Sequence, residues 1–78
     1  MATKEQLQEA LATMAGVDQA TVVGERNLIA TVVSPAFRER NEAERQESVW
    51  AYLRRQFGSE ELHNIEFIIT NTPEEAAP

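Results

Sequence analysis

A strand, a helix and a second strand follow one another between residues 28 and 70, and this order limits the possible folds. Leu28 to Val33 is rich in β-branched residues, and Pro35 ends it because proline lacks the amide that strand pairing needs. A helical pattern then begins at Asn41, and alternating residues from Ile65 to Thr70 predict another strand. If these two strands are neighbours they are parallel, with the helix crossing one face of the sheet.

The helix of this unit has a predicted beginning, an apolar face and an end. Asn41 with Glu44 three residues later has the spacing of a capping box, and we expect Gly58 to close the helix. One face carries Gln46, Val49, Trp50, Leu53 and Phe57. The helix is therefore expected to pack on the sheet through this face.

The aromatic residues receive different predictions from this pattern. Trp50 lies in the apolar stripe, so we expect it to be a buried core residue next to Leu11, Phe57 and Phe67 rather than a platform for stacking on bases. Tyr52 falls outside the stripe and is expected to be exposed. In the last strand Ile65, Phe67 and Ile69 alternate with Glu66, Ile68 and Thr70, which predicts one mainly buried face.

The residues before this unit predict a helix and a β-hairpin. Thr3 and Gln6 form a second capping box, and Gly16 is a helix stop signal, so we expect a helix from about Lys4 to Ala15. Its apolar residues recur at helical spacing, namely Leu7, Ala10, Leu11 and Met14. The strand Thr21-Val22-Val23 is expected to pair with Leu28 to Val33 through the turn Gly24-Glu25-Arg26-Asn27.

Together these elements predict one α+β domain spanning residues 1–78, a two-layer α/β sandwich of order α-β-β-α-β. Its mixed three-stranded sheet would carry the helices on one face. We expect the ordered core to cover about residues 3–72 and a short C-terminal tail to cover 73–78. Thr72-Pro73-Glu74-Glu75 has a cap, a proline at the first helical position and acids in the first turn, which favours one short helical turn there.

The composition excludes several functions. Thirteen acidic residues against seven basic ones give a net charge of −6, which disfavours nucleic-acid binding because Lys and Arg supply most of that affinity. The chain has one histidine and no cysteine, and no serine lies in a nucleophile-elbow motif, so we expect no enzymatic activity. The first residues contain no apolar run of signal-peptide or membrane-span length, which predicts a cytoplasmic protein.

The order of motifs in the second half resembles the BolA family. In that family a strand ending V-S-x-x-F leads through an R-H-R helix to a strand that begins H-A-L and ends T-P-E-E. The matching segments here are Val33-Ser34-Pro35-Ala36-Phe37, the helix with Arg45, Val49, Trp50 and Leu53, His63, and Thr72-Pro73-Glu74-Glu75. The resemblance runs without a gap from Phe37 to Leu53 and implies a fold like that of class II KH domains.

The resemblance also implies a function. In BolA-like proteins the histidine of the H-A-L motif ligates a [2Fe–2S] cluster shared with a monothiol glutaredoxin, and imidazole can replace thiolate on iron. We therefore expect His63 to be a cluster ligand, and Arg45, Gln46 and His63 to contact a glutaredoxin-type partner. The chain would hold no intrinsic cofactor, only a cluster bridged to the partner and glutathione. This implies a non-enzymatic accessory or regulatory protein that modulates iron–sulfur handling.

Some positions depart from the family pattern. His63 lies ten residues before Pro73, one more than the family spacing, which indicates a bulge or a local misalignment. Gln46 and Glu47 replace the histidine and second arginine of R-H-R, and the turn at 24–27 offers no Cys or His as a second ligand. Two alternatives therefore stay open: a divergent protein-interaction module with the same fold and no cluster, and a weak nucleic-acid-binding regulator.

Overall fold

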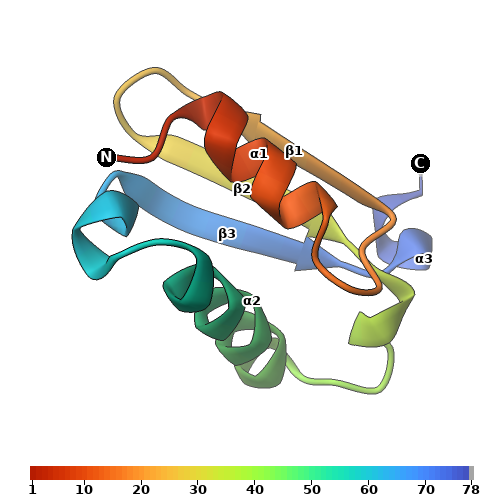
Figure 1. The fold of residues 1–78 in the computed structure, drawn as a ribbon. Helices are drawn as coiled ribbons and strands as arrows, with labels where there is room; N and C mark the ends of the chain where they lie inside the picture. Colours follow the sequence, from red (N-terminus) through yellow and green to blue (C-terminus); the bar gives the residue numbers. More distant parts are fainter. Residues whose placement is uncertain (78) are drawn as a thin grey trace.

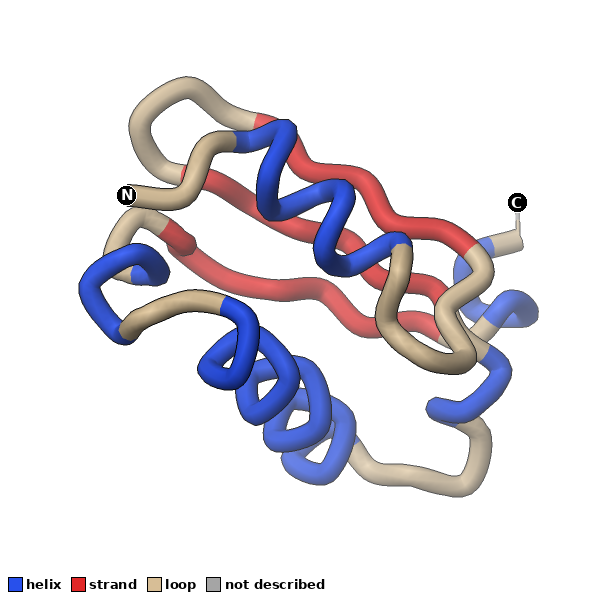
Figure 2. The backbone as a smooth tube through the Cα atoms, in the orientation of Figure 1, coloured by secondary structure: helices blue, strands red, loops and turns tan. Residues whose placement is uncertain are grey.

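The computed structural model describes residues 1–77, which form a three-stranded sheet with α1 and α2 on one face (Figure 1). The elements are α1 (Lys4–Ala12), β1 (Gln19–Val23), β2 (Leu28–Val33), the 3-10 helix η1 (Pro35–Phe37), α2 (Glu42–Gln56), the 3-10 helix η2 (Ser59–Leu62), β3 (Ile65–Asn71) and α3 (Pro73–Ala76). The central strand β2 runs antiparallel to β1 and parallel to β3 (Figure 2). The predicted α+β class and mixed sheet are confirmed.

The core lies between the two long helices and one face of the sheet. Leu7 and Leu11 of α1 and Val49 and Leu53 of α2 are completely buried. Phe37 is also buried, so the chain folds back onto the core after β2. The sheet contributes Val22, Leu28, Ala30, Val32, Ile65 and Ile68 to the same cluster. Burial of this apolar surface is the main favourable contribution to folding.

Local capping decides where the helices begin, as the sequence predicts. The capping boxes of α1 and α2 form, and α3 has a third one between Thr72 and Glu75. The ends differ from the prediction. The first helix stops at Ala12, not Ala15, because the chain turns at Thr13 toward β1. Gly58 has a φ of −70°, so it does not act as the left-handed helix cap.

A register shift reverses the alternation of β3. Leu28 of β2 pairs with Ile65, but the next residue, Ile29, pairs with Phe67, so β3 contains one extra residue. After the shift Ile68 faces the core, while Phe67 and Ile69 are 49% and 40% exposed on the open face of the sheet. The prediction that Ile65, Phe67 and Ile69 share the buried face is wrong for Phe67 and Ile69. The extra residue forms a bulge, which is one of the two explanations given for the ten-residue spacing from His63 to Pro73.

Side chains of the helices bond to both edges of the sheet. At the β1 edge, Gln8 Oε1 of α1 accepts the backbone N–H of Val22 at 3.0 Å. At the β3 edge, Gln46 Nε2 of α2 donates to the carbonyl oxygen of Ile68 at 2.7 Å. Edge groups without such partners favour pairing with another chain. The two glutamines therefore satisfy edge groups that a further strand could otherwise bind.

We predict that Ile68→Ala lowers the free energy of unfolding by about 2–5 kcal/mol, because it leaves a cavity in the core. Phe67→Ala should cost only about 1 kcal/mol, because roughly half of that side chain is already in water. Urea unfolding followed by circular dichroism measures both. A larger loss for Phe67→Ala than for Ile68→Ala would show that β3 follows the simple alternation of its sequence.

Candidate functional site

His63 lies on the turn between η2 and β3 rather than inside the strand, which begins two residues later. The segment Ser59-Glu60-Glu61 before it is part of η2. The backbone amide of His63 donates to the carbonyl of Glu60 at 3.4 Å, and the residue is exposed. Within residues 1–77 the imidazole makes no hydrogen bond or ion pair. It can therefore bind an external group without breaking an internal contact.

The turn that carries His63 is anchored on both sides. Leu62 and Asn64 are 7% and 9% exposed, so the exposed histidine sits between two buried residues. The carbonyl of Asn64 accepts the amide of Leu28 at 2.7 Å, and its side chain Nδ2 donates to the carbonyl of Ala2 at 3.1 Å. These contacts fix the backbone from which the imidazole projects.

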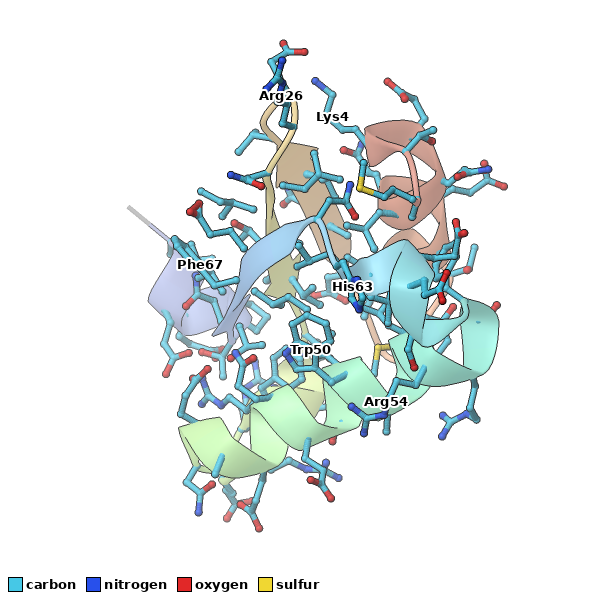
Figure 3. All side chains as sticks on the ribbon, turned by 90° about the vertical axis from the view of Figure 1, so that its left-hand side faces the viewer. Lys4, Arg26, Trp50, Arg54, His63 and Phe67 are labelled. Atoms are coloured by element: carbon cyan, nitrogen blue, oxygen red, sulfur yellow. The ribbon has the colours of Figure 1, made fainter. Side chains whose placement is uncertain are left out.

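A shallow surface hollow adjoins His63. Its other lining residues are Trp50, Arg54, Ser59 and Leu62. In Figure 3 the side chain of Trp50 lies between the turn of His63 and the backbone of α2, the helix that also carries Arg54. Phe67 lies away from these three residues. Sequence reasoning missed Arg54 as a site residue. The signal was present, because Trp50 and Arg54 have the i, i+4 spacing of neighbours on one helix face.

Trp50 is half-buried, so the prediction of a fully buried core residue is only partly right. The most buried residues of α2 are Val49 and Leu53, which places the adjacent Trp50 at the margin of the core. The predicted neighbour Phe67 lies on the open face of the sheet. Tyr52, predicted to be exposed, is half-buried too, and its hydroxyl donates to the carbonyl of Ala10 at 2.6 Å.

Arg45 is bound within the fold. Its guanidinium donates to the carbonyl of Thr70 at 3.3 Å, to the carbonyl of Arg40 at 3.0 Å and to the Glu75 carboxylate at 2.8 Å. It also lies 5.8 Å from the centre of the Phe37 ring, within cation–π range. Only 12% of the side chain is exposed. Arg45 thus joins α2 to β3 and to α3.

Gln46 also uses its side chain internally. Its Nε2 donates to Glu42 and to the carbonyl of Ile68, both at 2.7 Å, and its Oε1 accepts the indole N–H of Trp50 at 3.0 Å. The structure therefore does not bring Arg45, Gln46 and His63 into one cluster. Gln46 reaches the hollow beside His63 only through Trp50. Contact of Arg45 and Gln46 with a partner stays a prediction.

The Thr72-Pro73-Glu74-Glu75 segment is held by ion pairs. Arg38 binds Glu74 through two nitrogens, and this hydrogen bonding lowers the pKa of Glu74 from 4.5 to about 2. The hydrogen bond from Arg45 likewise lowers the pKa of Glu75 below its usual value. The two acids thus attach α3 to the rest of the domain.

The described residues offer little for a metal held by this chain alone. No group of three or more metal-binding side chains comes together within residues 1–77. The turn Gly24-Glu25-Arg26-Asn27 brings neither a histidine nor a cysteine toward His63, since the chain has no other histidine and no cysteine. Over the same residues no helix combines the length and the apolar character needed to span a bilayer.

Several solved structures share this architecture over nearly the whole chain. BolA1 from Arabidopsis thaliana matches with a TM-score of 0.69 and 17% identity, covering 99% of this chain and 100% of that one. The BolA domain of SufE1 from Arabidopsis thaliana matches with a TM-score of 0.69 and 18% identity, covering 96% and 98%. A BolA protein homologue from Coxiella burnetii gives 0.67 and 25% identity, covering 96% of each chain. This chain has a BolA-like fold.

The likeness is structural, because no family model and no curated protein sequence matches the chain. The resemblance read from its motifs and the similarity of its backbone nevertheless agree on one fold. In this BolA-like fold His63 precedes β3, and Thr72-Pro73-Glu74-Glu75 follows it. The motif positions thus occupy the two ends of one strand.

The lowered pKa of Glu74 predicts how α3 responds to acid. Because the folded pKa of about 2 lies below the ordinary value of 4.5, the Arg38–Glu74 pair stabilises the fold fully above pH 4.5 and loses this effect as the pH falls toward 2. We expect Glu74→Gln to flatten the fall in thermal midpoint over that interval. Glu47→Gln, which changes an exposed glutamate outside any ion pair in residues 1–77, serves as the control. If both variants keep the wild-type profile, the pair does not act in solution.

Proposed function

We propose that this protein is a non-enzymatic BolA-like accessory protein that presents His63 to a monothiol glutaredoxin-type partner and modulates iron–sulfur handling. One observation carries the proposal: an exposed imidazole without an internal partner projects from an anchored turn at the start of β3 in a BolA-like fold. The motif resemblance implies a cluster ligand at this position. The similarity to the BolA domain of SufE1 supports the family context.

A [2Fe–2S] cluster needs four ligands, usually Cys thiolates, and imidazole can replace some of them. The chain supplies one imidazole and no thiolate. These residues do not fit a cluster held by this chain alone, and they fit one shared with a partner. His63 would then give one nitrogen ligand, while the partner and glutathione give the others. When bound, the cluster supplies iron–sulfur and redox chemistry that the chain lacks.

The residues around His63 have supporting roles in this proposal. Leu62 and Asn64 hold the turn, so the backbone that carries the imidazole is positioned before the partner arrives. Gln46 acts at a distance, because its hydrogen bond orients Trp50 beside the histidine. Arg45 keeps α2 on β3. None of these groups forms a nucleophile–base pair, so the proposal includes no catalytic step.

Two observations bear on the alternatives. The lack of a second ligand beside His63 favours, as runner-up, an interaction module that binds a partner without a cluster. Nucleic-acid binding has the least support of the three candidate functions. The net charge of the chain is −6, and Glu74 and Glu75 neutralise two of its arginines, Arg38 and Arg45.

Co-expression with a monothiol glutaredoxin and iron tests the proposal. We expect a coloured complex whose visible circular dichroism changes in His63→Ala, because one cluster ligand is lost. The thermal midpoint of the free protein should move by less than about 2 °C, since exposed residues contribute little to stability. Asn27→Ala, on the exposed hairpin turn, is the matched control and should keep the wild-type spectrum.

The other outcomes separate the candidate functions. A complex that forms without colour supports the interaction module. A coloured complex with identical spectra for wild type and His63→Ala would remove His63 as a ligand. Failure of the glutaredoxin to co-purify contradicts the proposed function and leaves the interaction module, whose partner would then be a different protein.

A further inference from the structure

The hollow beside His63 combines an apolar wall with three polar groups that can donate hydrogen bonds. Trp50 and Leu62 give the apolar part, and Arg54, Ser59 and His63 surround it. Trp50 cannot rotate freely, because its indole N–H is bonded to Gln46 Oε1 at 3.0 Å. Gln46 is in turn bonded to Glu42 and to the carbonyl of Ile68. The apolar wall is therefore fixed before any ligand binds.

Arg54 differs from the arginines bound within the fold. Arg38 and Arg45 each pair with a glutamate, and Arg40 donates to Ser48 at 3.1 Å. In contrast, Arg54 makes no hydrogen bond or ion pair with any residue from 1 to 77, and His63 makes none through its side chain. In a chain of net charge −6, two such groups on one hollow mark a place where an anionic group can bind.

We propose that this hollow binds the terminal carboxylate of a peptide whose preceding side chain is apolar. The guanidinium of Arg54 would hold the carboxylate, since its planar fork matches the two oxygens. Ser59 and His63 can each donate a further hydrogen bond, and Trp50 with Leu62 would cover the apolar side chain. The inference goes beyond the proposed function, because it requires neither iron nor a glutaredoxin.

The surrounding charges favour a single negative charge on the ligand. Glu60 and Glu61 lie in η2 beside the hollow, and the overall charge is −6. A doubly charged phosphate is repelled more strongly by this field than a carboxylate is. The apolar wall adds affinity only for a ligand that has an apolar part next to its charge. Both features select a peptide carboxylate over a phosphate.

Titration of the metal-free protein with acetyl-leucyl-glycine tests this proposal. Trp50 is the chain's one tryptophan, so its fluorescence reports the hollow directly, and backbone amide NMR shifts of Ser59 and Leu62 provide a second readout. We expect saturable binding of the acid in low salt and at least about fivefold weaker binding of the C-terminal amide. Arg54→Gln should weaken binding of the acid about threefold to fivefold.

Arg55→Gln is the matched control. It removes an exposed arginine from the next position of α2, outside the hollow, and should leave binding of the acid peptide unchanged. Equal binding of the acid and the amide, or equal losses in the two arginine variants, would overturn the proposal. Inorganic phosphate that binds as tightly as the acid peptide would contradict the preference for a carboxylate.

Discussion

The side-chain amide of Gln46 bonds at once to the edge of the sheet, to its own helix and to the indole of Trp50. A glutamine can do this because its carbonyl accepts while its NH₂ group donates twice. The bond to the carbonyl of Ile68 fixes α2 against β3. The bond to Trp50 fixes one wall of the hollow beside His63. One polar side chain therefore couples the packing of the fold to its candidate site.

The bulge at the start of β3 determines which residues of this strand face the helices. It turns Ile68 and Thr70 toward the helices, and α2 side chains bond to the carbonyls of both residues at the edge. The same shift moves Phe67 to the open face, away from Trp50. Without the extra residue, the outward and inward faces of β3 would exchange. The register of one strand thus determines which of its residues face the helices and which lie on the open face.

Two of the acidic residues have a structural role in the fold. Two glutamates at the start of α3 bind Arg38, just after η1, and Arg45 of α2, and so attach the last helix to these two segments. Arg54, beside His63, is among the cations whose side chains have no partner within residues 1–77. A small acidic domain can therefore repel polyanions and still offer a local site for a singly charged group.

Much of the fold could be predicted because its signals are local. The capping residues Thr3, Asn41 and Thr72 start the helices, and the β-branched run at Leu28 to Val33 forms the central strand. The predictions failed where pairing between distant segments decides the result. Alternation in β3 could not reveal the register shift, and the helix face of Tyr52 could not reveal its bond to Ala10. The hollow depends on a turn and a helix that only the tertiary fold brings together.

Nuclear Overhauser contacts of the β3 side chains report the register of this strand in solution without altering the sequence. We expect contacts from the Ile68 methyl groups to Val49 and Leu53 of α2, and none from the Phe67 ring to that helix. Contacts from the Phe67 ring to α2, with the Ile68 methyl groups in water, would contradict this register. The bulge, the orientation of Trp50 by Gln46 and the hollow beside His63 would then all have to be abandoned.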